Sequence, residues 1–399
     1  MSTVPVVSAV QLGAADPSRP LLILGPSLGT SAQNLWGTSA QALAAHFHVL
    51  AWNLPGHGAS AAAGDGFSID ELAAGVLRAI DGVLAERGEP GGCFAYAGDS
   101  VGGAVGLQLL LDHPGRITAA TLLCTGARIG TPQGWAERAE LVRTNGTAEV
   151  VEGSAQRWFA PGFRDRRPDV VDDLLDGLRD TDRYSYAAVC DALAGFDVRD
   201  RLGEISTPVL AVAGAVDEPT PVASLRDIAD GVVHGRLVVL DHVAHLAPAE
   251  TPAEVARLIT DHSQPSRTVE DVREAGLAVR RAVLGDAHVD RATANTTEFT
   301  REFQDFITTY AWGSIWTRPG LDRRSRSLIT LTALVARGHH EELAMHIRAA
   351  RTNGLTNDEI KELLLQTAIY CGVPDANTAF RIAQGALAEM DAAESADQS

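Results

Sequence analysis

The stretch Phe94-Ala-Tyr-Ala-Gly-Asp-Ser-Val-Gly-Gly-Ala-Val-Gly-Leu-Gln-Leu-Leu-Leu111 decides the fold of this chain. The apolar run Phe94–Ala97 predicts a buried strand, and the segment 103–111 predicts a helix. Between them lies Gly98-Asp-Ser-Val-Gly102, a G-x-S-x-G pattern typical of a nucleophile elbow, in which glycines permit a sharp turn that lifts the serine hydroxyl out of a sheet. A plain glycine-rich turn between strand and helix is the alternative.

On both sides of this stretch, short apolar runs alternate with helical segments. They lie at 21–24, 49–52, 119–124, 208–213 and 236–240. Such alternation predicts an α/β fold with a doubly wound, mostly parallel sheet. The segment from about 128 to 196 lacks strand patterns and predicts a helical cap.

The alternation ends near residue 262, and the chain then changes character. We expect a polar linker at 263–267, a second domain at 268–391 and a flexible tail at 392–399. Helical spacing continues through the second domain, which predicts an all-α fold. Its expected helices are 269–283, 296–310, 322–336, 341–352 and 358–371.

Composition limits the class of protein. The chain has 399 residues and a net charge of −18, which disfavours nucleic acid and anionic membranes as partners. No apolar run reaches the roughly 18–20 residues of a membrane span, and no signal-peptide pattern opens the chain. The four cysteines are scattered without a CxxC pair, as expected of a cytoplasmic protein. Because the net charge is negative, an anionic substrate would need local arginine or histidine residues to bind.

A serine hydroxyl needs a general base to act as a nucleophile. Chain order predicts Asp217 and His245 as the partners of Ser100, because both follow strands whose carboxyl ends share one edge of the sheet. His242 is the competing histidine, and we prefer His245 because it leads directly into the last helix of the domain. The sequence therefore predicts a Ser100–His245–Asp217 triad.

Backbone N–H groups must stabilise the oxyanion that forms when the serine attacks. Val101 follows the nucleophile and is expected to supply one donor. Leu28, in the loop after the strand at 21–24, is expected to supply the other. His57 lies in a glycine-rich turn, and we interpret it as a turn residue without a catalytic role.

The first domain resembles the α/β-hydrolase family and, more narrowly, the 3-oxoadipate enol-lactone hydrolases. The narrower resemblance rests on Pro26-Ser-Leu-Gly-Thr30, on the segment 122–131 running into Trp135, and on Arg157-Trp-Phe159. It implies hydrolysis of a small enol-lactone that carries an acetate group. Trp135 would then line the pocket or only pack the cap. Arg128 would bind the substrate carboxylate or only be exposed.

The second domain carries His339, Glu342 and His346, whose i, i+3, i+7 spacing predicts one helical face. A metal site formed by two histidines and a carboxylate is conceivable, and a solvated polar face is the plainest alternative. We predict neither a metal nor an organic cofactor.

The strings 310–328, Glu342-Leu-Ala-Met-His346 and 353–356, with Tyr370-Cys-Gly-Val-Pro374, resemble the 4-carboxymuconolactone decarboxylase family. Related alkylhydroperoxidases place a CxxC pair on the equivalent helix, where this chain has His339 and Glu342. The resemblance therefore implies cofactor-free decarboxylation and disfavours a dithiol peroxidase, since the lone Cys371 cannot replace the pair.

Under this resemblance, His346 is the expected general acid, Glu342 orients it, and His339 donates to the lactone oxygen. Arg324 or Arg326 would bind a substrate carboxylate through a bidentate fork, or would pair structurally with other carboxylates.

The two resemblances together imply consecutive steps of protocatechuate catabolism, because the decarboxylase product is the lactonase substrate. The decarboxylase family forms rings of helical subunits, so we expect a homo-oligomer with residues 296–310 at the interface. The main alternative is a serine esterase of another substrate fused to a non-catalytic helical oligomerisation module.

Overall fold

The computed structural model describes residues 4–63, 66–263, 269–318 and 320–397. The chain divides into two compact units, Met1–Pro265 and Ser266–Ser399. Of the predicted linker 263–267, all but the first residue lies outside the described residues. In the described part of the chain, no helix is long and apolar enough to cross a membrane.

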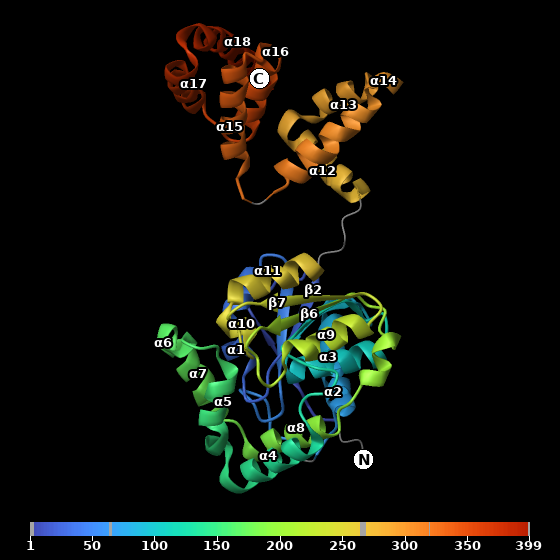
Figure 1. Cartoon of the computed structure of the whole chain (residues 1–399). Helices are drawn as coiled ribbons and strands as arrows, with labels where there is room; N and C mark the ends of the chain where they lie inside the picture. Colours follow the sequence, from blue (N-terminus) through green and yellow to red (C-terminus); the bar gives the residue numbers. More distant parts are fainter. Residues whose placement is uncertain (1–3, 64–65, 264–268, 319, 398–399) are drawn as a thin grey trace. The chain divides into compact units, whose positions relative to one another are not determined.

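The first unit is built on a seven-stranded sheet (Figure 1). Its strands are β1 Ser8–Gln11, β2 Leu21–Gly25, β3 His48–Asn53, β4 Phe94–Asp99, β5 Ile117–Leu123, β6 Val209–Gly214 and β7 Gly235–Leu240. Their order is β1-β3-β2-β4-β5-β6-β7, and only the β1–β3 pair is antiparallel. The predicted parallel α/β sheet is therefore confirmed. The edge strand β1 was not predicted.

Helices cover the sheet and enclose an extensive apolar core. They are α1 Ala32–Leu43, α2 Ile69–Glu86, α3 Val101–Asp112, α9 Val222–Gly231, α10 Ala247–Glu250 and α11 Pro252–Ser263. The start of α2 shows why the boundaries fall where they do. Ser68 accepts from the backbone N–H of Glu71, whose carboxylate accepts in return from the N–H of Ser68.

The segment between β5 and β6 contains helices and no strand, as its sequence predicted. The helices are α4 Pro132–Asn145, η1 Thr147–Val150, α5 Val151–Trp158, α6 Phe163–Arg166, α7 Pro168–Arg179 and α8 Arg183–Ala194, followed by η2 Arg199–Glu204. Figure 1 shows α4–α8 as a group of green helices beside the sheet. We refer to residues 128–196 as the cap.

The second unit is entirely helical in its described residues. Its elements are α12 Val269–Leu284, α13 Asp286–Ala294, α14 Glu298–Phe306, the π-helix η3 Ile307–Trp316, α15 Arg323–Arg337, α16 His340–Thr352, α17 Asn357–Cys371 and α18 Val373–Asp397. Two predictions were wrong. The expected single helix 296–310 is α14 followed by the start of η3, and the expected flexible tail is part of α18 as far as Asp397.

Two glycines bring α12 and η3 into backbone contact. A Cβ atom at Gly276 would lie 2.2 Å from the carbonyl oxygen of Thr308, and one at Gly313 would lie 2.2 Å from that of Val272. Real Cβ atoms do not approach this closely, so only glycine permits the packing. Beyond this contact, Val283 of α12 packs with Trp312 of η3 and Ala349 of α16.

Candidate active sites

The tight geometry of the nucleophile elbow explains why glycines flank Ser100. Ser100 lies between β4 and α3 with φ 53° and ψ −115°, a strained backbone for a residue with a side chain. A Cβ at Gly98 would lie 2.3 Å from the carbonyl oxygen of Gly102, and one at Gly102 would lie 2.6 Å from the carbonyl carbon of Gly25. The glycine on each side of Ser100 is therefore required by packing.

The structure brings the three predicted triad residues together. The Nε2 atom of His245 lies 2.9 Å from the Oγ atom of Ser100. The Nδ1 atom of His245 lies 3.1 and 3.0 Å from the two carboxylate oxygens of Asp217. All three residues are buried. A base within hydrogen-bond reach of the hydroxyl, oriented by a carboxylate, is the geometry that activates a serine.

Thr220 holds the acid of this triad in place, a role that the sequence analysis missed. Its hydroxyl donates to Oδ2 of Asp217 at 2.7 Å, and its N–H donates to Oδ1 at 3.0 Å. Burial favours the neutral form of Asp217, but the interactions with His245 and Thr220 outweigh burial and lower the pKa of the carboxyl. Asp217 is therefore ionised at neutral pH and able to stabilise an imidazolium.

Of the expected oxyanion donors, Leu28 lies in the loop after β2, and Val101 is the first residue of α3. The N–H of Gly102 donates to the carbonyl of Pro26 at 2.9 Å, which ties the first turn of α3 to the loop after β2. Leu28 and Val101 are both buried. Among the hydrogen bonds of the described residues, neither N–H has a protein acceptor, so both remain available to a developing oxyanion.

The cap contacts the triad through Trp158. Its carbonyl accepts from the N–H groups of His245 and Leu246, both at 3.2 Å. A Cβ at Gly29 would lie 3.4 Å from its indole ring. Trp158 therefore connects the histidine loop to the loop of Leu28, a role that its place in the sequence does not indicate.

Glu250 is a second connection between the cap and the histidine loop. Its carboxylate accepts from the N–H of Ala160 at 2.8 Å and from the N–H of Ala244 at 2.7 Å. Burial raises the pKa of the Glu250 carboxyl to about 7, although the two N–H donors and the charge of Arg166 lower it. Sequence reasoning missed this residue because its partners are backbone atoms far apart in the chain.

The two other histidines discussed for this domain lie outside the triad. His242 is exposed in a turn with φ 60°. His57 is fully buried, stacks on Tyr186, and its Nδ1 atom lies 2.8 Å from the carbonyl oxygen of Pro55. Burial lowers the pKa of His57 to about 4, against the opposing effects of Pro55 and Asp182. A neutral packing role follows for His57.

Trp135 and Arg128 lie where the cap begins. The indole N–H of Trp135 donates to the carbonyl of Ile129 at 2.6 Å, and the ring packs against the main core. Arg128 is half-buried, and its charge helps to lower the pKa of Asp197. These contacts agree with packing roles, and neither residue lines a cavity described below.

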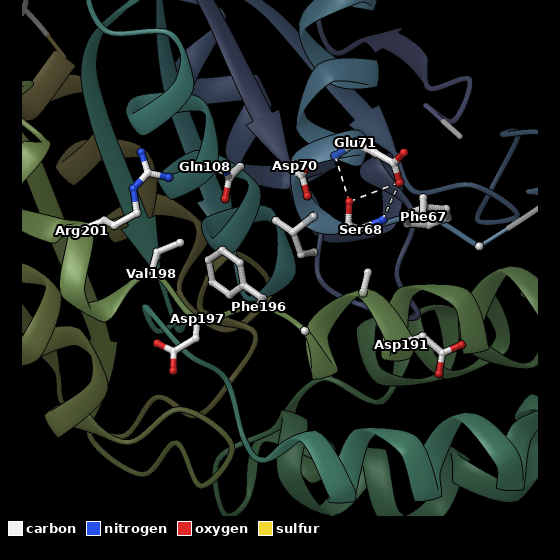
Figure 2. Close-up of a pocket in the computed structure, with 14 residues that line it drawn as sticks. Phe67, Ser68, Asp70, Glu71, Gln108, Asp191, Phe196, Asp197, Val198 and Arg201 are labelled. Atoms are coloured by element: carbon white, nitrogen blue, oxygen red, sulfur yellow. Dashed lines mark hydrogen bonds between the residues drawn. The ribbon is translucent and has the colours of Figure 1, made fainter. Parts of the chain in front are cut away.

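Two cavities of the first unit lie outside the triad. One, of about 600 Å³, includes Phe159 and Ala160 of the cap together with Val216, Glu218 and Ala244, the neighbours of Asp217 and His245. The other, of about 450 Å³, lies beside α2, α3 and α8 (Figure 2). In Figure 2 its lining includes Asp70, Gln108 and Phe196, and no triad residue contributes to it.

In the second unit the predicted cluster is only partly assembled. His339 precedes α16 with ψ 69° and is exposed, because the left-handed Gly338 ends α15 just before it. It is the N-cap residue of the helix that carries Glu342 and His346, and its side chain makes no hydrogen bond that caps the helix. Glu342 is exposed, and His346 is half-buried. Burial lowers the pKa of His346, while the charge of Glu342 raises it.

The predicted carboxylate-binding arginines differ in their partners. Arg324 pairs with both oxygens of Glu359 and with the carbonyl of Gly354. Arg324 lowers the pKa of Glu359 to about 2, with help from Thr356. Its fork is therefore occupied, and the prediction that it holds substrate is not supported. Arg326 donates only to the carbonyl of Arg318 among the described residues, and stays a candidate.

Sequence reasoning missed two basic residues of the second unit, His288 and Arg280. The charge of His288, on α13, contributes to lowering the pKa of His346. Burial lowers the pKa of His288 itself, and Arg280 and Arg291 add to that effect. Arg280 is buried on α12. Across the described residues of both units, no three His, Cys, Asp or Glu side chains gather as metal ligands would.

The fold, the strained elbow and the hydrogen-bonded triad define the first unit as a serine hydrolase of the α/β type. Comparison with known families agrees: the alpha/beta hydrolase family matches residues 22–258, and the carboxymuconolactone decarboxylase family matches residues 301–385. The chain belongs to the alpha/beta hydrolase family and, through its second unit, to the carboxymuconolactone decarboxylase family.

Individual relatives divide between the two units in the same way. The first is similar to 3-oxoadipate enol-lactonase 2 of Acinetobacter baylyi, with 35% identity over 60% of this chain and 86% of that protein. The second is similar to 4-carboxymuconolactone decarboxylase of the same organism, with 46% identity over 29% of this chain and 86% of that protein. The crystal structure of the enol-lactonase from Burkholderia xenovorans covers 64% of this chain and 95% of its own, with 30% identity and a TM-score of 0.60.

Proposed function

We propose that this chain is a bifunctional catabolic enzyme. Its second unit decarboxylates 4-carboxymuconolactone to 3-oxoadipate enol-lactone, and its first unit hydrolyses that lactone to 3-oxoadipate. The observation that carries the proposal is that one chain combines an assembled serine triad, in a unit similar to an enol-lactonase, with a unit similar to 4-carboxymuconolactone decarboxylase, whose reaction would precede lactone hydrolysis.

Hydrolysis begins at Ser100. As its Oγ atom attacks the lactone carbonyl, Nε2 of His245 takes the hydroxyl proton, and Asp217 stabilises the imidazolium. The N–H groups of Leu28 and Val101 donate to the carbonyl oxygen as it becomes negative. The ring C–O bond then breaks, and His245 returns the proton to the departing enol oxygen.

Water completes the first reaction. His245 takes a proton from water as the water attacks the acyl group on Ser100, and the serine regains its proton when the ester bond breaks. The released enol tautomerises to the ketone of 3-oxoadipate. Trp158 fixes the backbone of the histidine loop during both halves of this sequence, because its carbonyl accepts the N–H of His245.

Decarboxylation needs a proton and an electron sink but no external oxidant. When the bond from the ring to the carboxylate breaks, CO2 leaves, and the electron pair flows through the ring double bond onto the lactone carbonyl. A proton then adds to the ring carbon next to that carbonyl. His346 is our candidate acid, and the negative charge of the substrate raises its pKa when it binds.

Assembly with other copies supports the second site. Phe299, Phe303, Phe306 and Tyr310 are all more than half exposed. Their spacing places them along one face of α14 and the start of η3, and no residue of α14 is buried. An uncovered aromatic stripe of this kind is typical of a protein interface. We propose that copies of this chain cover it in a homo-oligomer.

The wider setting follows from the same reactions. We place the enzyme in the protocatechuate branch of the 3-oxoadipate pathway and in the cytoplasm. The four free thiols agree with a reducing compartment. The substrates are small anionic lactones, and neither reaction requires a cofactor.

Separate assays test the two activities. The full chain is given purified enol-lactone in one cuvette and 4-carboxymuconolactone in another, and loss of each is followed by its ultraviolet absorbance. We expect turnover of both. Turnover of the enol-lactone alone would favour the alternative in which the second unit is an oligomerisation module.

A further inference from the structure

Arg280 is an unusual side chain because it is buried without a counter-ion. It is only 7% exposed. Its Nη1 atom donates to Oε1 of Gln304 and to Oγ1 of Thr308, and its Nη2 atom donates to the same Gln304 oxygen, all at 3.2 Å. Both acceptors are neutral. Among the residues that the structure describes, no carboxylate lies within ion-pair distance of this guanidinium.

One edge of the guanidinium is unused. An arginine has five N–H donors, and those of Nε and Nη2 form a fork that matches the two oxygens of a carboxylate. The Nε atom of Arg280 is buried and has no hydrogen-bond partner in the described part of the chain. The end-on contact with Gln304 leaves this Nε/Nη2 edge free.

The same edge holds carboxylates elsewhere in this protein. Among the described residues, six arginines donate from both Nε and Nη2 to the two oxygens of one acidic side chain. They are Arg87, Arg167, Arg199, Arg201, Arg257 and Arg273. The carboxylates of all six pairs are exposed, although the Arg87 side chain itself is largely buried, and such pairs contribute little to stability. Arg280 presents this edge in a buried setting, where a bound anion would interact far more strongly.

Helices α12, η3 and α16 pack closely around the part of α12 that carries Arg280. Gly276 lies one helical turn before Arg280, and its contact with Thr308 draws η3 against α12. Val283 of α12 packs against Ala349 of α16. Val283 lies three residues after Arg280, and Ala349 lies three residues after His346. His288 lies close enough to both side chains to interact with their charges.

We propose that Arg280 binds a carboxylate of the lactone decarboxylated in the second unit, and that this carboxylate is the acetate group retained in the product. The inference rests on the proposed decarboxylase function. It replaces Arg324, whose fork is occupied by Glu359, with a residue whose fork is free.

The choice between the two carboxylates of the substrate follows from the reaction. The departing group loses its charge as it becomes CO2, so a strong ion pair with it would stabilise the substrate more than the transition state. The acetate group keeps its charge throughout. Binding it holds the substrate in the site without raising the barrier.

The test compares adjacent arginines of α12. Arg280→Met removes the buried guanidinium, and Arg280→Lys keeps the charge without the fork. Arg281→Met is the matched control, because Arg281 is on the surface and already pairs with Asp286 and Asp290. All are made in the full chain with Ser100→Ala, so that the enol-lactone product persists and its inhibition of decarboxylation can be measured.

We expect Arg280→Met to raise both the KM for 4-carboxymuconolactone and the inhibition constant of the enol-lactone by about 10- to 100-fold, the effect of losing a hydrogen-bonded charge. Arg280→Lys should fall between Arg280→Met and the Ser100→Ala parent, and Arg281→Met should match that parent. The thermal midpoint of Arg280→Met should not fall, since an uncompensated buried cation costs stability.

Three outcomes would overturn the inference. An unchanged KM would show that Arg280 does not bind substrate. A raised KM with an unchanged inhibition constant would assign it to the departing carboxylate. A drop in thermal midpoint, with Arg280→Lys recovering stability but not KM, would make the residue structural. If the Ser100→Ala parent itself releases no CO2, the proposed function fails, and that failure is distinct from these.

Discussion

The two units of this chain differ in how completely one copy builds its site. In the first unit, Ser100, His245 and Asp217 are buried and joined by hydrogen bonds of 2.9 to 3.1 Å. In the second, Glu342 is exposed, and no hydrogen bond joins it to His346 among the described residues. The first site is completed by folding of a single copy, whereas the candidate residues of the second are not joined to one another within one copy.

The two sites differ in the interactions that hold their side chains in place. Backbone strain at Ser100, close glycine packing and hydrogen bonds to Trp158 and Glu250 fix the first site within one fold. In the second unit, Arg280 is buried on α12, but among the described residues no hydrogen bond holds the half-buried side chain of His346. Predictions that affect one unit and spare the other test this contrast.

The largest expected effect belongs to the first unit. Ser100→Ala removes the nucleophile and should lower the rate of enol-lactone hydrolysis by about 10⁴-fold or more, as in other serine triads. The initial rate of decarboxylation should equal that of the unmodified chain. The measurement is loss of supplied enol-lactone beside CO2 release from 4-carboxymuconolactone. Hydrolysis near the original rate would show that Ser100 is not the nucleophile.

His346→Ala is the matching change in the second unit. Loss of a general acid should lower the rate of CO2 release by about 10²- to 10⁴-fold, with hydrolysis of supplied enol-lactone unchanged. In the unmodified chain, decarboxylation kcat/KM should fall as pH rises through the pKa of His346, which burial holds below the ordinary 6.5, because the protonated form is lost. Loss of both activities would instead indicate that the assembly had collapsed.

Phe303→Glu tests whether the second site depends on assembly. Removing a Phe side chain from an interface loses about 1.5–3 kcal/mol of burial free energy. In sedimentation experiments the variant should therefore dissociate at a higher protein concentration than the unmodified chain does. Decarboxylation should fall with dissociation, and hydrolysis should stay constant. The control is Arg301→Gln, a change of similar size on the same helix. A fully active dissociated variant would show that one copy completes both sites.

The smallest expected effect concerns Glu250 and pH. Its pKa of about 7 in the folded chain lies above the ordinary 4.5, so its contribution to stability is fully present below pH 4.5 and is lost as pH rises toward 7. The free energy of unfolding of the first unit should fall by up to about 1 kcal/mol per pH unit in that window. Glu250→Gln should lack this slope in denaturant titrations. Equal slopes would place the ionisation elsewhere.

Much of the first unit could be predicted because its signals are local. Apolar runs mark β2 to β7, and Gly98 and Gly102 mark the elbow. The edge strand β1 could not be predicted, because two of its four residues are half-buried, the other two are exposed, and they form no continuous apolar run. Glu250 and Trp158 also escaped prediction, since their functional contacts involve backbone atoms of distant segments.

The second unit was harder to predict for a related reason. Residues 307–316 form a π-helix, whose spacing differs from the 3.6-residue pattern used to find helices. In the sequence, Arg280 is one polar residue of an ordinary amphipathic helix, and the contact of that helix with η3 depends on two glycines 37 residues apart, Gly276 and Gly313. A contact of that kind leaves no periodic signal in the sequence.

The central claim is that one chain performs two consecutive reactions at two independent sites. The most direct measurement supplies the unmodified full chain with 4-carboxymuconolactone and follows CO2, enol-lactone and 3-oxoadipate in one time course. We predict CO2 and 3-oxoadipate in equal final amounts, with enol-lactone appearing and then disappearing. Release of CO2 without 3-oxoadipate, or a substrate that remains unchanged, would contradict the account.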